Sequence, residues 1–361
     1  MSEPEPGRRR PRRRAADGRT PAPVETGNDG QRESSRLERR ALDRERGEPL
    51  AAGERARPQP RATDRLARPL AEWTSRPRIL VTNDDGIESR GLLALKQALD
   101  PLGDTYVLAP ETNQSAVGHA KTMMRPLRVR ERTLADGSRG WSVDGSPTDA
   151  VSLAFLGYLN LSFDLVASGI NYGANLGDDI TYSGTVSAAM EAVINNCPAF
   201  AISQEYYEHP DFTLAGRAAH VAAVNILENG LAPGQLINVN VPAIGEAECE
   251  GFEVTRMGKR IYQDLLIERV DPRGIPYYWI GGPPPSGLAV PGTDFHAVVN
   301  RRIALTPIQL DLTARRLLGR LRSWNWQLPA EGAPVPAARP VSAAAAQADE
   351  PLEQEHELER R

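Results

Sequence analysis

Two adjacent carboxylates, Asp84 and Asp85, stand where an apolar run of the chain ends. Residues 79–82 are Ile, Leu, Val and Thr, Asn83 separates them from the acids, and Gly86 follows. Such a run is typical of a buried parallel strand, and ligand sites in open α/β sheets lie beyond the carboxyl ends of the strands. Neighbouring carboxylates repel each other unless a cation or a shared proton relieves them, so the pair favours a hard divalent ion such as Mg²⁺ or Mn²⁺. A turn with solvated acids is the alternative.

Two residues in later polar segments could complete such a metal site. Ser115 lies in the segment 113–119, which follows the second predicted strand, and Asn171 opens the polar segment 171–179. A hydroxyl and an amide oxygen added to two carboxylates leave coordination positions for water and substrate, which is typical of a catalytic ion. Taken singly, either segment could be an ordinary polar turn.

A further segment is suited to bind an anion. Ser183, Gly184 and Thr185 stand at the predicted start of a helix. Free backbone N–H groups, the positive end of the helix dipole and two hydroxyls at that point favour a phosphate. A helix cap without a ligand is the alternative. A metal ion beside an anion cradle favours hydrolysis of a phosphoryl group, and four such segments in one domain exceed what turn chemistry requires.

The order of the acids bears on the mechanism. A water molecule activated by the ion is expected to attack phosphorus in line, with Asp84 as the carboxylate closest to that water and as its base. A covalent aspartyl-phosphate would need a second acid two residues after the nucleophile. Gly86 occupies that position relative to Asp84. The sequence therefore favours direct attack by water.

Strand-like and helix-like segments alternate between residues 78 and 241. The run 78–82, an amphipathic helix from Ser89 and the segment 105–109 predict a β-α-β unit with parallel strands. Strands are predicted again at 163–167, 198–202 and 237–241, and helices at 146–156, 185–195 and 213–228. This alternation predicts an α/β fold with a doubly wound, mostly parallel sheet.

The character of the chain changes near residue 245. The segments 252–256, 277–280 and 302–305 are β-rich and are separated by Pro and Gly. They predict antiparallel hairpins in an extension, or arm, at about 245–306, and a last helix is predicted at 310–321.

Composition places this domain, at 77–325, between two charged tails. Residues 1–76 are rich in Arg, Glu, Pro, Gly and Ala, and residues 326–361 are rich in Pro and Ala with an acidic end, so both tails are expected to be disordered. The net charge of −4 argues against a nucleic-acid duplex as partner. No apolar stretch is long enough to span a membrane, no secretory signal is recognisable, and two unpatterned cysteines fit a reducing compartment. The sequence thus predicts a cytoplasmic protein.

Several long motifs, taken together and in order, resemble one family. They are ILVTNDDG from residue 79, SGINYGANLGDDITYSGTVSAAMEA from residue 168, NVNVP from residue 238, DPRGIPYYWI from residue 271, and GTDFHAV and LTPIQLDLT after residue 292. The chain is similar in these motifs to the SurE family of stationary-phase survival proteins. The resemblance covers about residues 78–320 and leaves both tails unmatched.

The resemblance implies a metal-dependent 5′-nucleotidase that acts on nucleoside monophosphates, with 3′-nucleotides and short polyphosphate as possible further substrates. It implies a Rossmann-like three-layer α/β/α core and a C-terminal extension that exchanges between subunits, giving a homodimer or homotetramer. On the family pattern, one Mg²⁺ or Mn²⁺ per subunit is held by Asp84, Asp85, Ser115 and Asn171. The substrate phosphate is surrounded by Asn83, Ser183, Gly184 and Thr185.

Two departures from the family pattern and two rival functions remain. Ala116 stands where a glycine is expected, and residues 300–303 replace a strand start that usually contains Gly and Tyr. The second departure puts the packing of the exchanging arm in doubt.

Two other functions are alternatives to a nucleotidase. A nucleotide-binding regulator could use the same pocket without turnover, and an interaction protein could act through the charged tails.

Overall fold

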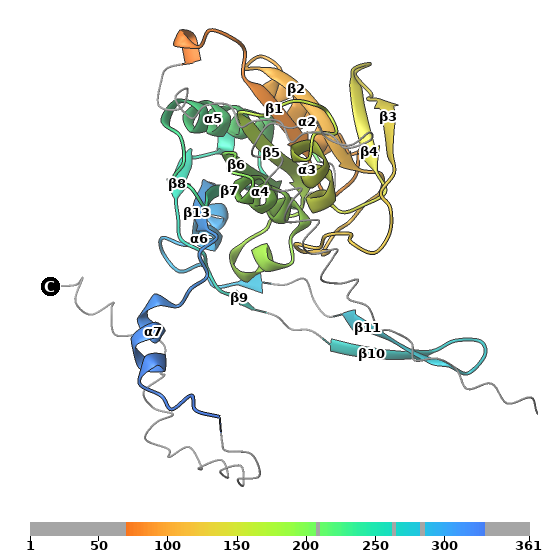
Figure 1. Cartoon of the computed structure of the whole chain (residues 1–361), viewed down its shortest axis with the longest axis vertical. Coiled ribbons are helices and arrows are strands. Elements are labelled where there is room, and N and C mark those ends of the chain that lie inside the picture. Colours follow the sequence, from red (N-terminus) through yellow and green to blue (C-terminus); the bar gives the residue numbers. More distant parts are fainter. Residues whose placement is uncertain (1–69, 207–209, 262–264, 282–285, 329–361) are drawn as a thin grey trace, which may run out of the picture. The chain divides into compact units, whose positions relative to one another are not determined.

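The computed structural model describes residues 70–206, 210–261, 265–281 and 286–328. The chain divides into two compact units, residues 1–310 and residues 311–361. The first unit contains a nine-stranded sheet in the order β3-β4-β2-β1-β5-β6-β7-β13-β8 (Figure 1). Its strands are β1 (Arg78–Thr82), β2 (Asp104–Pro110), β3 (Val129–Thr133), β4 (Arg139–Val143), β5 (Leu165–Tyr172), β6 (Ala199–Gln204), β7 (Gln235–Val241), β8 (Phe252–Val254) and β13 (Ile303–Gln309).

The centre of the sheet is parallel and reverses its direction of growth at β1. β1 pairs in parallel with β2 on one side and with β5 on the other, and β5, β6 and β7 continue in parallel. The chain thus leaves β1 toward β2 and later returns to its opposite side with β5. Ligands of such sheets bind at this switch point, beyond the carboxyl ends of the strands.

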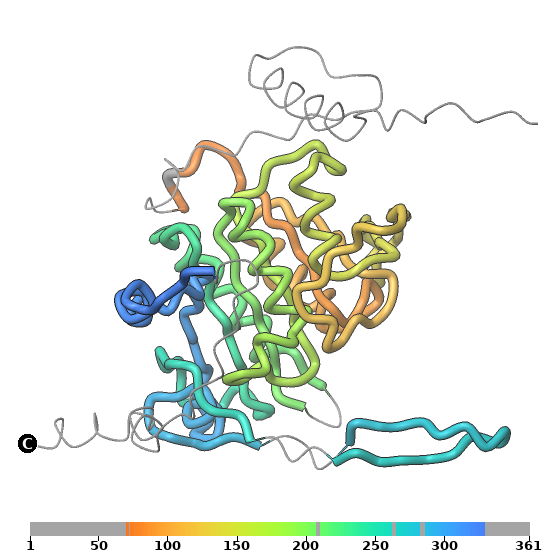
Figure 2. Tube along the Cα trace, turned by 60° about the horizontal axis from the view of Figure 1, so that its bottom comes forward, coloured from red at the N-terminus to blue at the C-terminus, as the bar shows by residue number. Residues whose placement is uncertain are grey.

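Helices cover both faces of this sheet. α2 (Arg90–Leu99) and α5 (Thr213–Asn229) pack on one face, where their leucines and alanines meet one side of β1, β5 and β6 in one hydrophobic cluster. α3 (Pro147–Phe155) and α4 (Gly184–Ile194) pack on the other face in a second cluster. The predicted three-layer α/β/α core with a mostly parallel sheet is therefore confirmed. Figure 2 follows the chain through these layers.

Local sequence signals place the helix starts. Ser146 caps α3 with a full capping box, because its hydroxyl accepts from the N–H of Asp149 while the Asp149 carboxylate accepts from the N–H of Ser146. Pro147 occupies the first turn, where its missing N–H has no cost. Ser183 caps α4 by accepting from the N–H of Val186. Four short helical elements of the described residues were not predicted, namely the 3₁₀ turns η2 (Leu70–Glu72), η3 (Gly177–Thr181) and η4 (Glu246–Glu248), and the helix α6 (Asp294–Val299).

The expected extension is smaller than the sequence predicts. The predicted segments at 252–256 and 302–305 contain β8 and the start of β13, and they do not form hairpins in an extension. Instead, β13 pairs antiparallel with β7 and parallel with β8, so β8 and β13 belong to the main sheet. The expected hairpin at 277–280 does form, from β10 (Leu265–Val270) and β11 (Pro276–Gly281). A second small pair joins β9 (Arg260–Ile261) to β12 (Ser286–Gly287).

Residues just before the predicted domain boundary at 77 contact the core. Leu70 and Trp73 pack on the core beside α5. Arg76 forms an ion pair with Asp104. These apolar side chains give residues 70–76 enough buried surface to be part of the domain. The last helix, α7 (Arg315–Arg322), belongs to the second unit. The disorder predicted for residues 1–69 and 329–361 lies outside the described residues.

Candidate active site

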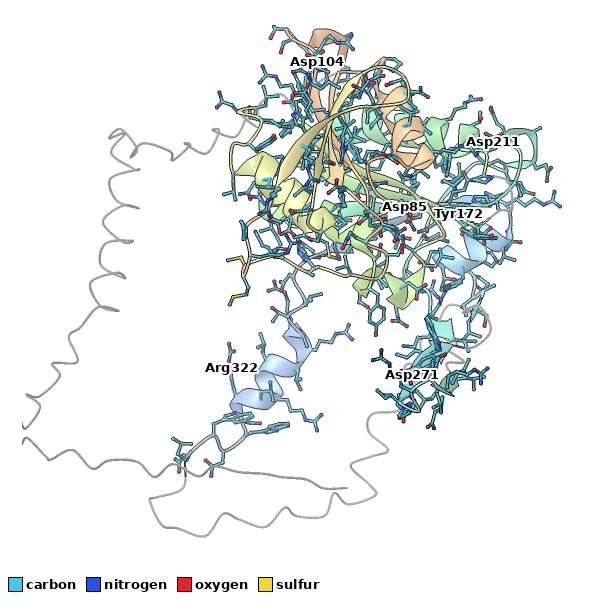
Figure 3. All side chains as sticks on the ribbon, turned by 90° about the vertical axis from the view of Figure 1, so that its right-hand side faces the viewer. Asp85, Asp104, Tyr172, Asp211, Asp271 and Arg322 are labelled. Atoms are coloured by element: carbon cyan, nitrogen blue, oxygen red, sulfur yellow. The ribbon has the colours of Figure 1, made fainter. Side chains whose placement is uncertain are left out.

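The two acids lie at the carboxyl end of β1, at the switch point of the sheet. Asp84 is buried, with 3% of its surface exposed, and Asp85 is half-buried. Gly86 has φ +102°, a conformation that strains residues with a side chain, and it closes the turn that follows the acids. The Asp85 carboxylate accepts from the backbone N–H of Tyr172 in β5 at 3.2 Å (Figure 3). The neighbouring strand β5 therefore fixes Asp85.

Burial raises the pKa of both acids, because the hydrogen bonds that they accept only partly compensate for lost solvation. The pKa of Asp84 is raised from 3.8 to about 6, chiefly by desolvation; a hydrogen bond from Thr185 opposes this rise and the charge of Asp85 adds to it. Burial also raises the pKa of Asp85. No Lys, Arg or His forms an ion pair with either acid within the described residues. Among the described residues, no cationic side chain neutralises the two carboxylates.

The start of α4 packs directly on Asp84. The Thr185 hydroxyl donates a short hydrogen bond to Oδ1 of Asp84. A Cβ added to Gly184 would lie 2.7 Å from the Cβ of Asp84, so only glycine permits this approach. Gly184 and Thr185 are the first two residues of the helix, whose N–H groups have no partner within the helix. The structure thus brings the predicted anion cradle against the predicted metal ligand.

The segment that carries Ser115 is tied to the acids by its backbone and by Asn113. The N–H of Gln114 donates to the carbonyl of Asp84 at 2.7 Å, and the Asn113 amide donates to Asp85 at 3.3 Å. Asn113 also accepts from the N–H of Ser115 at 2.8 Å. Ser115 is exposed. Sequence analysis did not single out Asn113, whose contacts on both sides hold this segment beside the acids.

Ala116 has φ +58°, the left-handed conformation in which glycine is favoured. This backbone angle explains why a glycine is expected at that position. The departure from the family pattern is therefore accommodated by a strained residue next to Ser115 rather than by a different turn.

Asn171 is part of β5 rather than of the loop after it. It pairs with Ser203 of β6, beyond an irregularity in the strand pairing that follows Ser168. Its amide nitrogen donates to the carbonyl of Gly173 at 2.7 Å, and no hydrogen bond to its amide oxygen is found among the described residues. This orientation leaves an oxygen for a metal ion.

Asn83 is fully buried and its side chain closes the turn that carries the acids. Its amide nitrogen donates to the carbonyl of Gly86 at 3.0 Å, and its amide oxygen accepts from the N–H of Gly86 at 3.2 Å. Both amide atoms thus serve the turn. Contact between Asn83 and a phosphate stays a prediction.

The predicted donors fit a hard divalent cation. Two carboxylates without a cation partner, a hydroxyl and an amide oxygen are the oxygen ligands that Mg²⁺ and Mn²⁺ take. No group of three or more His, Cys, Asp or Glu side chains suited to a metal occurs in the described ranges, so a zinc-type centre is absent from them. An oxygen-rich site with open positions is what these residues can build.

A buried glutamate behind the site was missed by sequence analysis. Glu191 of α4 accepts from Ser152 at 2.6 Å, Lys121 at 3.1 Å and His119 at 3.3 Å. Burial alone would raise the pKa of Glu191, but these hydrogen bonds outweigh it and lower the pKa to about 2. These three partners lie 39 to 72 residues away, and Asn195, four residues further along the chain, also donates to Glu191, at 3.3 Å. Glu191 anchors the end of the segment that carries Ser115.

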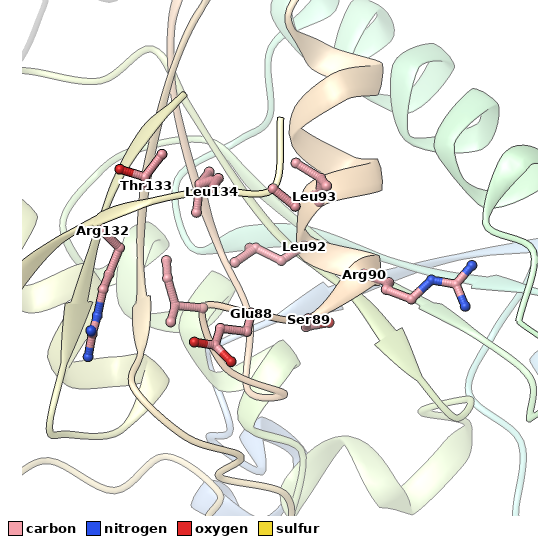
Figure 4. Close-up of a pocket in the computed structure, with 10 residues that line it drawn as sticks. Glu88, Ser89, Arg90, Leu92, Leu93, Arg132, Thr133 and Leu134 are labelled. Atoms are coloured by element: carbon pink, nitrogen blue, oxygen red, sulfur yellow. The ribbon is translucent and has the colours of Figure 1, made fainter. Parts of the chain in front are cut away.

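A cavity of about 350 Å³ opens beside the turn that follows the acids. Its floor is apolar, from α2 and the end of β3, and Glu88 and Arg132 lie at its edge (Figure 4). Arg132 is held by Glu111 and by Ser142. None of the predicted site residues lines this cavity.

The family model described as "Survival protein SurE" matches residues 79–264. The chain belongs to the SurE family. Among its relatives, "5′-nucleotidase SurE" of Chloroflexus aggregans is 47% identical over 251 residues, which are 69% of this chain and 99% of that protein. The protein of the same description from Herpetosiphon aurantiacus is 49% identical over 69% of this chain and 98% of its own length.

A solved structure supports the same assignment. The crystal structure of the SurE protein from Aquifex aeolicus is similar with a TM-score of 0.60 and 38% sequence identity. The similarity covers 68% of this chain and 98% of that chain. The SurE domain thus accounts for about two thirds of the chain, and the predicted family and fold class are confirmed.

Proposed function

We propose that the protein is a divalent-metal-dependent phosphomonoesterase that hydrolyses nucleoside 5′-monophosphates to nucleoside and phosphate. The observation that carries this proposal is the contact between the start of α4 and Asp84, since a helix start is suited to an anion and the adjacent acids are suited to a divalent cation. Relatives aligned over nearly their whole length are named 5′-nucleotidases.

In the proposed site, Asp84, Asp85, Ser115 and Asn171 hold one Mg²⁺ or Mn²⁺. The bound ion supplies positive charge at the phosphate and lowers the pKa of water. The choice between the two metals and the number of ions rest on the donor chemistry and the family pattern.

The residues of the chain bind the phosphate and move the proton. Phosphate oxygens are expected at the start of α4, at the N–H group of Gly184, with the Ser183 hydroxyl at the cap, Thr185 donating to Asp84, and Asn83 holding the turn beside them. A water oxygen forms a bond to phosphorus as the bond to the ester oxygen breaks, and Asp84 accepts the proton that the water loses. The ester oxygen takes up a proton from solvent water and departs as the nucleoside hydroxyl, and Asp84 returns the proton that it accepted to solvent.

A screen for phosphate release from nucleoside monophosphates tests this proposal. Wild-type protein is assayed with Mn²⁺, with Mg²⁺ and with chelator, beside the Asp85→Asn variant. The proposal expects release that depends on metal and is lost in the variant. Release that persists in chelator, or that Asp85→Asn leaves intact, would contradict it. A regulator that binds nucleotide without turnover would release no phosphate in any condition.

We also propose that the C-terminal extension joins subunits in a homodimer or homotetramer. The β10–β11 hairpin exposes large apolar side chains, including Leu266, Trp279 and Ile280 with exposed fractions of 73%, 62% and 83%. Two-stranded hairpins are marginally stable alone, and exposed apolar surface of this kind favours a partner surface. Light scattering of the Leu266→Ser/Ile280→Ser variant should report a smaller mass than the wild type.

No helix within the described residues is long and apolar enough to cross a membrane. A cytoplasmic location and the absence of a nucleic-acid partner stay predictions of the sequence.

The other rival function, an interaction protein that acts through its charged tails, is tested by deleting residues 1–69. This deletion should leave phosphate release unchanged.

A further inference from the structure

An ion pair joins β9 to the turn that precedes α4. The guanidinium of Arg260 lies 2.8 Å from a carboxylate oxygen of Asp179 in η3, and the two side chains are only 13% and 18% exposed. Arg260 also lies over the ring of Phe295 at 5.6 Å. The neighbouring pair, Lys259 and Asp178, is separated by 3.2 Å but lies largely in solvent.

A second contact holds the same turn. The fully buried carboxylate of Asp294 accepts from the N–H of Gly177 and from the N–H of Gly258, both at 2.8 Å. A Cβ added to Gly177 would lie 2.7 Å from the Gly258 carbonyl oxygen, so the two backbones touch. The turn at 177–181 is therefore held to the segment 258–260 at Gly177 and at Asp179.

This turn leads straight into the proposed phosphate cradle. The carbonyl oxygen of Asp179 accepts from the N–H of Tyr182 at 3.0 Å and from the N–H of Ser183 at 3.1 Å. Ser183 caps α4, and the next residue, Gly184, packs on Asp84. The side chain of Asp179 thus holds Arg260 while its backbone holds the cap of the helix.

We infer that Arg260 is a positioning residue for phosphate hydrolysis, acting through Asp179 to fix the start of α4 over the bound phosphate. The inference rests on the proposed function of that helix start. Because the pair is mostly buried, removing the guanidinium leaves a carboxylate that is poorly solvated, and the turn must move to hydrate it. The exposed Lys259–Asp178 pair is screened by solvent and can be lost with little effect.

The test compares Arg260→Gln with Lys259→Gln in the full chain. Each variant removes one positive charge from the same segment and one ion pair to the same turn. A small displacement of groups that bind a reacting phosphate reduces rate strongly, so Arg260→Gln should lower kcat/KM roughly 10- to 100-fold while Lys259→Gln stays within about twofold of wild type. Arg260→Lys, which retains the charge, should recover part of the loss.

Two further readouts separate positioning from a loss of structure. The inhibition constant for inorganic phosphate should rise in Arg260→Gln, because the cradle is displaced, while the affinity for Mn²⁺ stays that of wild type. If Arg260→Gln does not fold, the Asp179→Asn/Arg260→Gln variant removes both charges of the pair and should show the same pattern.

The outcomes are distinguishable. Arg260→Gln with wild-type kcat/KM and wild-type inhibition by phosphate would overturn the inference. Equal losses of phosphate inhibition, Mn²⁺ affinity and folded fraction would also overturn it, in favour of a structural role. If Asp85→Asn keeps metal-dependent activity in the same experiment, the proposed function fails independently of Arg260.

Discussion

The buried charge of Asp84 should destabilise the metal-free protein, and Asp84→Asn should relieve that cost. The pKa of Asp84 is raised from 3.8 to about 6, which at roughly 1.4 kcal/mol per pH unit corresponds to about 3 kcal/mol at pH 8. An asparagine has nearly the same shape and can still accept from the Thr185 hydroxyl. We therefore expect the metal-free variant to be more stable than wild type at pH 8 by up to about 3 kcal/mol.

The pH dependence follows from the direction of the shift. Because the folded state raises the pKa of Asp84, the protonated acid favours folding. Its contribution to stability is fully present below the unfolded pKa of 3.8 and is lost as the pH rises through about 6. The advantage of Asp84→Asn should accordingly be small near pH 4 and reach its full size above about pH 7.

Urea unfolding with chelator, at pH 4, 6 and 8, measures this difference, and the same titration with Mn²⁺ supplies the control. Added Mn²⁺ should stabilise wild type and not the variant, because the ion stabilises only the state that binds it. A variant that is less stable than wild type at pH 8 without metal would refute the reasoning, since it would mean that protein groups already compensate the Asp84 charge.

Three other substitutions have expected outcomes. Gly184→Ala should reduce kcat/KM by roughly tenfold or more in steady-state kinetics, because the added Cβ would displace the helix start from Asp84. Kinetics equal to those of wild type would show that this contact is not needed. In Glu191→Gln, the loss of folding stability between pH 4.5 and about 2 should be smaller than in wild type, because hydrogen bonds to the charged form lower the pKa of Glu191 and support folding above that range. Thermal melts across this pH range measure it, and an unchanged dependence on pH would contradict the prediction. Ala116→Gly should raise the free energy of unfolding by a few tenths of a kcal/mol, because it removes a left-handed strain of roughly 1 kcal/mol but gives the unfolded chain greater freedom. A lower free energy of unfolding would show that Ala116 makes favourable contacts instead.

The sequence could predict the site where neighbouring residues encode it. Asp84 and Asp85 follow a continuous apolar strand, and Ser183 to Thr185 open a helix, so local patterns locate both groups at the edge of the sheet. β1 has the predicted bounds, and α4 begins one residue earlier than predicted.

Long-range contacts could not be predicted in this way. β8 and β13 have the composition of an extension, yet they join the main sheet because the edge of β7 offers pairing to β13. Glu191 and Arg260 act on partners that are distant in sequence, and nothing in their local pattern distinguishes them from solvated charges. Asn171 was expected in a loop, whereas the irregular pairing of β5 with β6 keeps it within the strand.

The proposed function depends on a divalent cation between the phosphate and the two acids, Asp84 and Asp85. Anomalous diffraction from crystals grown with Mn²⁺ would locate this ion. We expect one strong peak within coordination distance of Asp84, Asp85, Ser115 and Asn171. Crystals that diffract well and show both carboxylates without an ion, under conditions in which the protein releases phosphate, would contradict the account.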